Sequence, residues 1–352
     1  MTDLMSPLQL SSSIDDLLGP SESRFFGSGY RRVGQRISRL SWDEEHQMLN
    51  AVAGVLYPVD WSVKQQAAKL APHLSTIDAL LFAAQLAEAA LTARHGLTAG
   101  QRRAAWLRKV EIRAGAAPQE QGLTSFPVSA ELKESPVAPQ DAAALVSLVI
   151  CRIGQMTVRC TVEHAAGTGA GAAVDDDMLG PVGQRPYGTG YRAYRQSMTD
   201  LRVDAHGLVP TVAGQVAVRP ALGEAIGSDG LEGAYQPGMT LVDAFVIALQ
   251  FGQVLLYELD SVARADSNTL WMRRTVLESS RPDRPAAVAA PVTAILDNAK
   301  IVQAQGADWR NADIVAETGG VRVLCSVTHK LPEHRTNPAA ATQDPALLRA
   351  AA

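Results

Sequence analysis

The sequence has few of the residues that define disulfide-rich, metal-binding or membrane proteins. It contains three cysteines, an odd and small number that suits a reducing cytosol and argues against a disulfide framework. It has no C-x-x-C or H-x-x-x-H pair, so it predicts no metal site. No apolar run reaches the roughly 18 residues that a membrane span requires.

Charge is also nearly balanced. The formal net charge is −4 and the isoelectric point is near 6.0, which gives no general attraction to nucleic acid or to an anionic membrane. The first 20 residues lack the basic and apolar segments of a secretory signal. We therefore expect a soluble cytoplasmic protein with no nucleic-acid or membrane partner.

The chain contains an internal repeat with an offset of 165 residues. Rare residue types recur on this one register, which chance seldom produces. The matching pairs are Trp106 and Trp271, Cys160 and Cys325, and His164 and His329. Near the start of each copy, Gly27-Ser28-Gly29-Tyr30-Arg31 matches Gly188-Thr189-Gly190-Tyr191-Arg192 after a slip of four residues. The sequence thus predicts two copies of one folding unit.

The repeat and the composition together set the expected boundaries. The segment between the copies is rich in Gly and Ala and carries three consecutive aspartates, as flexible linkers often do. Both ends look poorly ordered. The predicted division is a disordered N-terminus (1–21), a first repeat (22–165), a linker (166–183), a second repeat (184–332) and a disordered C-terminal tail (333–352).

The sequence of each copy predicts one long helix followed by four strands. The helices, residues 76–95 and 241–259, are apolar almost all round and must be enclosed. The segments after each helix alternate between apolar and polar residues or are rich in β-branched residues, as strands are. Glycines stand between the last two segments, where a hairpin turn is expected. In the first copy these segments are 106–112, 125–132, 145–153 and 157–163. An antiparallel sheet that wraps one buried helix is the hot-dog arrangement, so we predict an α+β tandem hot-dog with its two sheets paired edge to edge.

Each long helix carries a polar pair seven residues apart, hence on one face. The pairs are Asp78 with Gln85, and Asp243 with Gln250. An acid at a helix N-terminus can act as a base beside free N–H groups that stabilise an oxyanion. Both acids also complete capping boxes of the form [ST]-x-x-[DE]. Asp78 and Asp243 are therefore either catalytic residues or caps, and the two glutamines are candidates for substrate binding.

Two features before the first helix have no match in the second copy. His73, opposite Gly238, is placed to be a general base, or is an ordinary loop histidine. The preceding loop could roof a pocket, or could be a packed loop anchored by its tryptophan. Its candidate substrate-binding residues are Tyr57, Asp60, Trp61 and Lys64.

The Gly-Ser/Thr-Gly-Tyr-Arg segments resemble a phosphate loop only superficially. They lack the Lys-Ser/Thr ending and the strand–turn–helix context, so a bend into the first strand is the simpler interpretation. Arg31 and Arg192 could still bind a substrate phosphate or a carrier's phosphopantetheine.

Three segments resemble the avirulence protein D (AvrD) family: Arg24–Tyr30, Tyr57–Lys64 and Pro72–Leu80. The resemblance extends over residues 20–332. It implies an enzyme that joins a β-ketoacyl thioester, carried on acyl carrier protein or CoA, to a small ketose such as xylulose. The product would be an acyl-sugar lactone of the syringolide type, made without a cofactor.

Two other classes fit the same residues. One is a hot-dog dehydratase or thioesterase that acts on acyl thioesters, and the other is a non-catalytic protein that binds acyl lactones. All three need an apolar acyl tunnel, so the sequence does not separate them. It also leaves a homodimer open.

Overall fold

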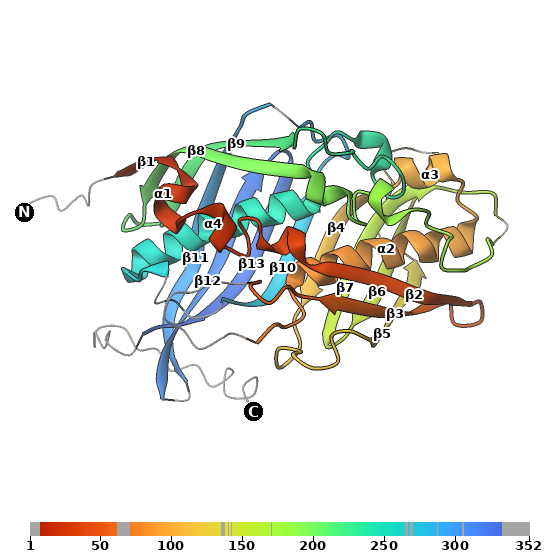
Figure 1. Ribbon diagram of the computed structural model, residues 1–352, viewed down its shortest axis with the longest axis horizontal. Helices are drawn as coiled ribbons and strands as arrows, with labels where there is room; N and C mark the ends of the chain where they lie inside the picture. The colour runs from red at the N-terminus through yellow and green to blue at the C-terminus, as the bar shows by residue number, and fades with distance from the viewer. Residues whose placement is uncertain are drawn as a thin grey trace, which may run out of the picture.

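The computed structural model describes residues 8–61, 71–134, 138–139, 141, 143–169, 171–264, 267, 270–286, 288–304 and 306–332 of the 352. Its strands form one large antiparallel sheet, which confirms the sheet type that the sequence predicts. The long helices α2 and α4 lie one after the other along the same face of this sheet (Figure 1).

The two halves of the chain present their elements in nearly the same order. The first half contains β2 (Gly34–Asp43), β3 (Met48–Leu56), α2 (Thr76–His95), α3 (Ala99–Ala104), β4 (Trp106–Arg113), β5 (Phe126–Glu134), β6 (Ala144–Ile153) and β7 (Met156–Ala165). The second half contains β8 (Tyr194–Asp204), β9 (Thr211–Pro220), α4 (Leu241–Asp260), β10 (Trp271–Ser279), β11 (Ala290–Ala304), β12 (Ala307–Thr318) and β13 (Val321–Lys330).

The order of strands within the sheet is also the same in both halves. It runs β2-β3-β5-β6-β7-β4 in the first half and β8-β9-β11-β12-β13-β10 in the second. The halves join where β4 pairs antiparallel with β10, from Lys109 opposite Glu278 to Arg113 opposite Arg274. The long helix of each half packs on the strands of its own half.

The long helices begin and end for local reasons. A complete capping box starts each one, with Ser75 and Asp78 on α2 and Thr240 and Asp243 on α4. α2 ends at His95, and the capping residue Gly96 that follows has a φ of 64°, the left-handed conformation that favours glycine. By length and composition both helices could cross a membrane, but 100% and 89% of their apolar windows are buried inside the protein, as in core helices.

Glycines make the last hairpin turn of each half. Gly154 links β6 to β7 with a φ of 56°, and Gly319 and Gly320 link β12 to β13 with φ values of 56° and 80°. Residues with a Cβ atom rarely adopt these angles. Both predicted hairpins are confirmed.

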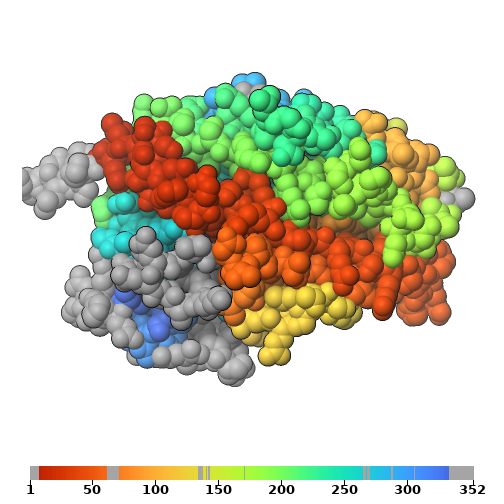
Figure 2. Space-filling view, viewed as in Figure 1, coloured from red at the N-terminus to blue at the C-terminus, as the bar shows by residue number. Residues whose placement is uncertain are grey.

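The prediction that residues 1–21 are disordered is wrong for most of that segment. Residues Gln9–Ser13 form β1, which pairs with β8, and Ile14–Leu18 form the short helix α1. Ile14 and Leu18 are 3% and 2% exposed, because α1 packs on α4. In Figure 2 the red N-terminal part of the chain, which includes this segment, runs across the face of the molecule from the second half to the first.

The predicted linker is packed rather than free. The backbone N–H groups of Gly169 and Ala172 donate to the carbonyl oxygens of His95 and Ala93, at the end of α2, and Leu179 is buried. The predicted C-terminal tail, residues 333–352, lies outside the described residues.

Candidate functional site

A cavity of ≈ 260 Å³ lies at the N-terminus of α2, between the two halves. Its apolar wall consists of residues from both halves, among them Phe25, Phe26, Trp61, Leu74, Met156 and Leu270. Its polar lining includes Arg24, His73, Ser75, Thr76, Gln253 and Arg264. The cavity is thus a largely apolar space with a few convergent polar groups, the usual character of a small-molecule site.

Trp61 builds one side of this cavity and holds His73 there. The indole is 8% exposed, and its ring centroid lies 5.5 Å from that of Tyr57, 5.6 Å from Phe25 and 5.8 Å from His73. All three pairs are edge-on, the favourable geometry for aromatic rings. Trp61 and His73 therefore form part of the cavity wall, on either side of residues 62–70.

Asp78 lies behind the cavity, not in it. Its side chain is 1% exposed and accepts four hydrogen bonds. One oxygen accepts from the backbone N–H (3.0 Å) and hydroxyl (2.6 Å) of Ser75 and from the Tyr57 hydroxyl, and the other accepts from the Gln35 amide (2.8 Å). Burial and the Asp78 carboxylate raise the pKa of Tyr57 well above its usual value, so this hydroxyl keeps its proton. The cap prediction for Asp78 is confirmed.

Gln35 connects Asp78 to the other half of the chain. Its amide oxygen accepts from Arg192 Nη2 at 3.0 Å and from the Tyr191 hydroxyl at 3.3 Å. Arg192 also donates to the carbonyl oxygen of Val33 at 2.6 Å. The Arg192 guanidinium, a candidate phosphate ligand in the sequence, thus already donates hydrogen bonds to protein groups.

Asp243 has equivalent surroundings, with the roles of the two halves exchanged. It accepts from the N–H (2.9 Å) and hydroxyl (2.7 Å) of Thr240 and from Gln196, which in turn contacts Tyr30 and Arg31 of the first half. Burial raises the pKa of Asp243, against the effect of these hydrogen bonds.

Between the two carboxylates, Tyr30 and Tyr191 stack with ring centroids 6.1 Å apart. Each half therefore supplies a Tyr-Arg pair to the carboxylate network of the other half.

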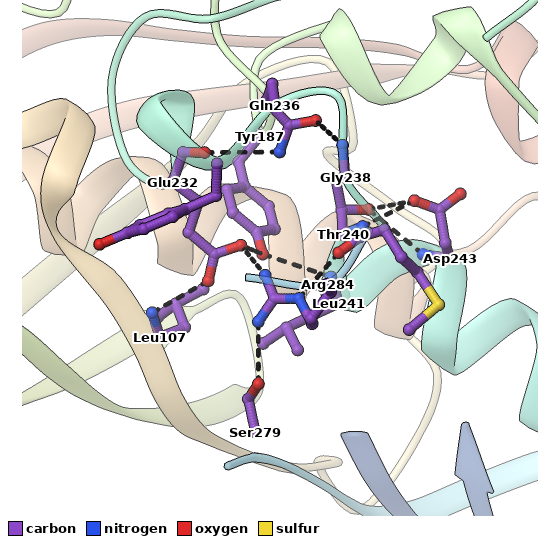
Figure 3. A network of polar contacts seen from close by, with 12 residues as sticks. Leu107, Tyr187, Glu232, Gln236, Gly238, Thr240, Leu241, Asp243, Ser279 and Arg284 are labelled. Carbon is purple, nitrogen blue, oxygen red and sulfur yellow. Dashed lines mark hydrogen bonds and ion pairs between the residues drawn. The ribbon is translucent and has the colours of Figure 1, made fainter. Parts of the chain in front are cut away.

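Among the described residues, protein side chains gather in front of the N-terminus of α4. Figure 3 shows a buried network there, centred on an ion pair between Glu232 and Arg284, which are 0% and 1% exposed. The Tyr187 hydroxyl donates to Glu232 at 2.7 Å and accepts the N–H of Leu241, the first residue of α4, at 3.3 Å. Arg284 also donates to the Ser279 hydroxyl at 2.9 Å. Protein groups thus occupy this helix end.

The two helix starts differ at equivalent sequence positions. Thr76 is the counterpart of Leu241, and it lines the cavity. Among the described residues, no group accepts a hydrogen bond from the Thr76 N–H. Phe26, the counterpart of Tyr187, also lines the cavity but has no hydroxyl with which to cap the helix.

The other predicted residues that the structure describes do not line the cavity. Asp60 is exposed and pairs with Arg32 at 2.8 Å. Gln85 donates to the Leu81 carbonyl at 3.1 Å on its own helix. Gln250 accepts from Arg24 at 2.5 Å, Arg31 donates to Gln196 and to the Gly27 carbonyl, and Lys64 lies outside the described residues.

Of the predicted set, the structure brings His73 and Trp61 into the cavity, with Tyr57 directly behind. Sequence reasoning missed Gln35 and Gln196, although Tyr-Arg-x₃-Gln occurs in both copies and could have revealed them. Within the described part of the chain, no three His, Cys, Asp or Glu side chains gather in a way suited to a metal ion.

A family model supports the resemblance read from the sequence. The model of the Pseudomonas avirulence D protein (AvrD) matches residues 9–332, nearly the whole chain. The chain belongs to the AvrD family. No curated protein matches this AvrD-family chain.

Solved structures that resemble the AvrD-family chain share little of its sequence. A tesB protein of Mycobacterium avium subs. paratuberculosis is 11% identical, with 90% of this chain and 100% of that one covered and a TM-score of 0.39. A 12:0-ACP thioesterase from Umbellularia californica is 10% identical, with 90% and 98% covered and a TM-score of 0.39. A hot-dog protein from Alicyclobacillus acidocaldarius is 10% identical, with 84% and 96% covered and a TM-score of 0.37. At these values the likenesses carry no functional argument.

Proposed function

We propose that the chain is a biosynthetic enzyme that condenses a β-ketoacyl thioester with a small ketose, xylulose-like, to give an acyl-sugar lactone. In this proposal residues 22–165 and 184–332 are two hot-dog units, and the acyl donor is delivered on acyl carrier protein or CoA. The observation that carries the proposal is the apolar cavity at the start of α2, with a histidine in its wall. Membership of the AvrD family supports it.

His73 is the proposed general base. It removes the proton of a ketose hydroxyl, whose oxygen attacks the thioester carbonyl carbon. The thiolate then leaves and takes a proton from His73, which gives an acylated ketose and a free thiol. The N–H of Thr76, at the positive end of α2, stabilises the oxyanion that forms in between.

Ring closure uses the same base. The carbon between the two carbonyl groups of the acyl chain is acidic, and His73 can deprotonate it. This carbon adds to the ketone carbonyl of the bound sugar, and loss of water leaves an unsaturated lactone. Asp78 holds Tyr57 and Ser75, and so fixes the loop and the helix start on either side of His73.

Product analysis tests the proposal. The purified protein is incubated with a β-ketoacyl thioester, with and without ketose, and products are identified by mass. We expect ketose-dependent acyl transfer that falls roughly 10²–10⁴-fold in His73→Gln, because general base catalysis contributes that much. The matched control is His206→Gln, an exposed histidine outside the cavity, which should keep the full rate.

Other outcomes reject the proposal. Free acid or enoyl product without ketose would indicate a thioesterase or a dehydratase. Unchanged thioester that nevertheless binds would indicate a non-catalytic acyl-binding protein. Equal losses of rate in His73→Gln and His206→Gln would show that His73 is not the general base.

A further inference from the structure

Two arginines, Arg24 and Arg264, line the cavity. Arg24 is 3% exposed and donates to Gln250 and to Asp15. Arg264, just after α4, is half-buried and donates to the Ser23 carbonyl at 2.9 Å. Burial lowers the pKa of Arg24 against the effect of its Asp15 partner, and the nearby charge of Arg264 lowers it further. No carboxylate in the described part of the chain lies within ion-pair distance of Arg264.

An equivalent cluster, formed by Arg185 of the second half with Arg102 and Glu88 of the first half, contains the same pair of charges together with an anion. Arg185, the counterpart of Arg24 in the sequence repeat, lies near Arg102, which follows α2 much as Arg264 follows α4. Glu88, which is 4% exposed, lies with these two arginines. Its Oε1 is 3.3 Å from Arg102 Nε, and its Oε2 accepts the N–H of Leu231 at 3.1 Å.

At the position of Glu88 in the repeat, 165 residues later, α4 carries Gln253, which lines the cavity. At the first site Asp15, which does not line the cavity, pairs with Arg24, and Glu120 is part of the cavity lining. The position that corresponds to Glu88, however, holds the neutral amide of Gln253 beside an open volume. Paired guanidinium groups bind carboxylate and phosphate well, since their N–H groups match both oxygens of such an anion.

We propose that the cavity binds an anionic group of the substrate, a carboxylate or a phosphate, between Arg24 and Arg264, in the place that the Glu88 carboxylate takes between Arg102 and Arg185. The inference rests on the proposed function only in assigning this cavity to the substrate. It names the substrate class: the acceptor or the acyl donor carries an anion that the site holds.

Binding of inorganic phosphate and of acetate tests the inference without turnover. We expect phosphate or acetate, compared with chloride at equal ionic strength, to raise the melting temperature and to give a measurable Kd by calorimetry. Arg264→Gln should weaken this binding at least tenfold (roughly 1.4 kcal/mol), while Arg159→Gln, an exposed arginine on β7, should not.

Gln253→Glu is the sharper variant, because it supplies the carboxylate from the protein. It should abolish anion binding and leave the melting temperature equal to or above that of the wild type. Lack of binding of both anions to the wild type, or unchanged binding in both Arg264→Gln and Gln253→Glu, would overturn the inference.

Two further comparisons identify the source of the anion and separate the two proposals. A phosphorylated ketose that displaces inorganic phosphate, when the unphosphorylated sugar does not, assigns the anion to the acceptor. Displacement by CoA or by a free β-keto acid assigns it to the donor. His73→Gln should keep anion binding and lose turnover, so that a protein that binds phosphate but makes no product contradicts the proposed function alone.

Discussion

Replacement of Asp78 by Asn distinguishes between two roles for this residue, a catalytic base and a helix cap. The asparagine oxygen can take the place of the oxygen that accepts from Ser75 and Tyr57. Its NH₂ group then faces the Gln35 NH₂, donor against donor. Gln35 cannot turn its amide over without cost, because its oxygen already accepts from Arg192 at 3.0 Å.

Two losses of folding free energy therefore add in Asp78→Asn. Loss of the charge at the helix N-terminus costs about 0.3–1 kcal/mol. Loss of a hydrogen bond to a charged acceptor costs about 1.5–3 kcal/mol. The sum of about 2–4 kcal/mol corresponds to a decrease in melting temperature of about 3–6 °C for a cooperative protein of this size. Asp243→Asn should cost a similar amount, since Gln196 is held in the same way by Arg31.

Scanning fluorimetry of both variants and product formation at 25 °C measure the two effects. We expect matched thermal losses and nearly unchanged turnover in both variants, because neither carboxylate lines the cavity. A loss of turnover of a hundredfold or more in Asp78→Asn alone, well below its melting temperature, would show that Asp78 is the base and that the assignment of His73 is mistaken.

Three further perturbations follow from buried groups. Arg284→Met leaves the Glu232 carboxylate buried without its ion partner and should cost about 3–5 kcal/mol; adding Glu232→Gln should restore part of the lost melting temperature, and a further loss would contradict the pairing. Burial lowers the pKa of His95 to about 4, so the unfolded chain gains a proton below about pH 6.5 that the folded chain does not take up. Stability should therefore fall between about pH 6.5 and 4, and a pH series of melting temperatures should be flatter in His95→Gln. A Cβ on Gly252 would lie 2.4 Å from Ile314 Cδ1, so Gly252→Ala should destabilise by about 1–3 kcal/mol in thermal unfolding, and adding Ile314→Val should recover part of that loss.

The sequence predicts the helices well because their signals are local. Each begins at a capping box and is apolar on every side, and the predicted span 76–95 coincides with α2. The second helix extends one residue beyond the predicted 241–259 and ends at Asp260. Hairpin glycines likewise specify their own turns, because the required φ is a property of one residue.

The site is harder to predict because its partners come from the other half. Nothing local indicates that Gln35 contacts Arg192, or that Gln196 contacts Arg31, since these pairs are 157 and 165 residues apart. The same limit explains why Arg31 and Arg192 look like free phosphate ligands in the sequence. A flexible-looking N-terminus is misjudged for a similar reason, as α1 is ordered by burial of Ile14 and Leu18 against distant residues.

Divergence between the two halves explains why the start of α2 faces a cavity while protein groups occupy the start of α4. At the start of α4, the Tyr187 hydroxyl caps the helix, and a buried ion pair fills the space in front of it. At the start of α2, Phe26 has no hydroxyl, and the neutral Gln253 of α4 lines the cavity where the equivalent cluster has the Glu88 carboxylate of α2. Each change exchanges an internal polar group for room beside a helix N-terminus and two arginines. The filled end retains the hydrogen bonds and the ion pair that hold it together, and the open end retains the donors, so a ligand at α2 can make the interactions that the protein makes for itself at α4.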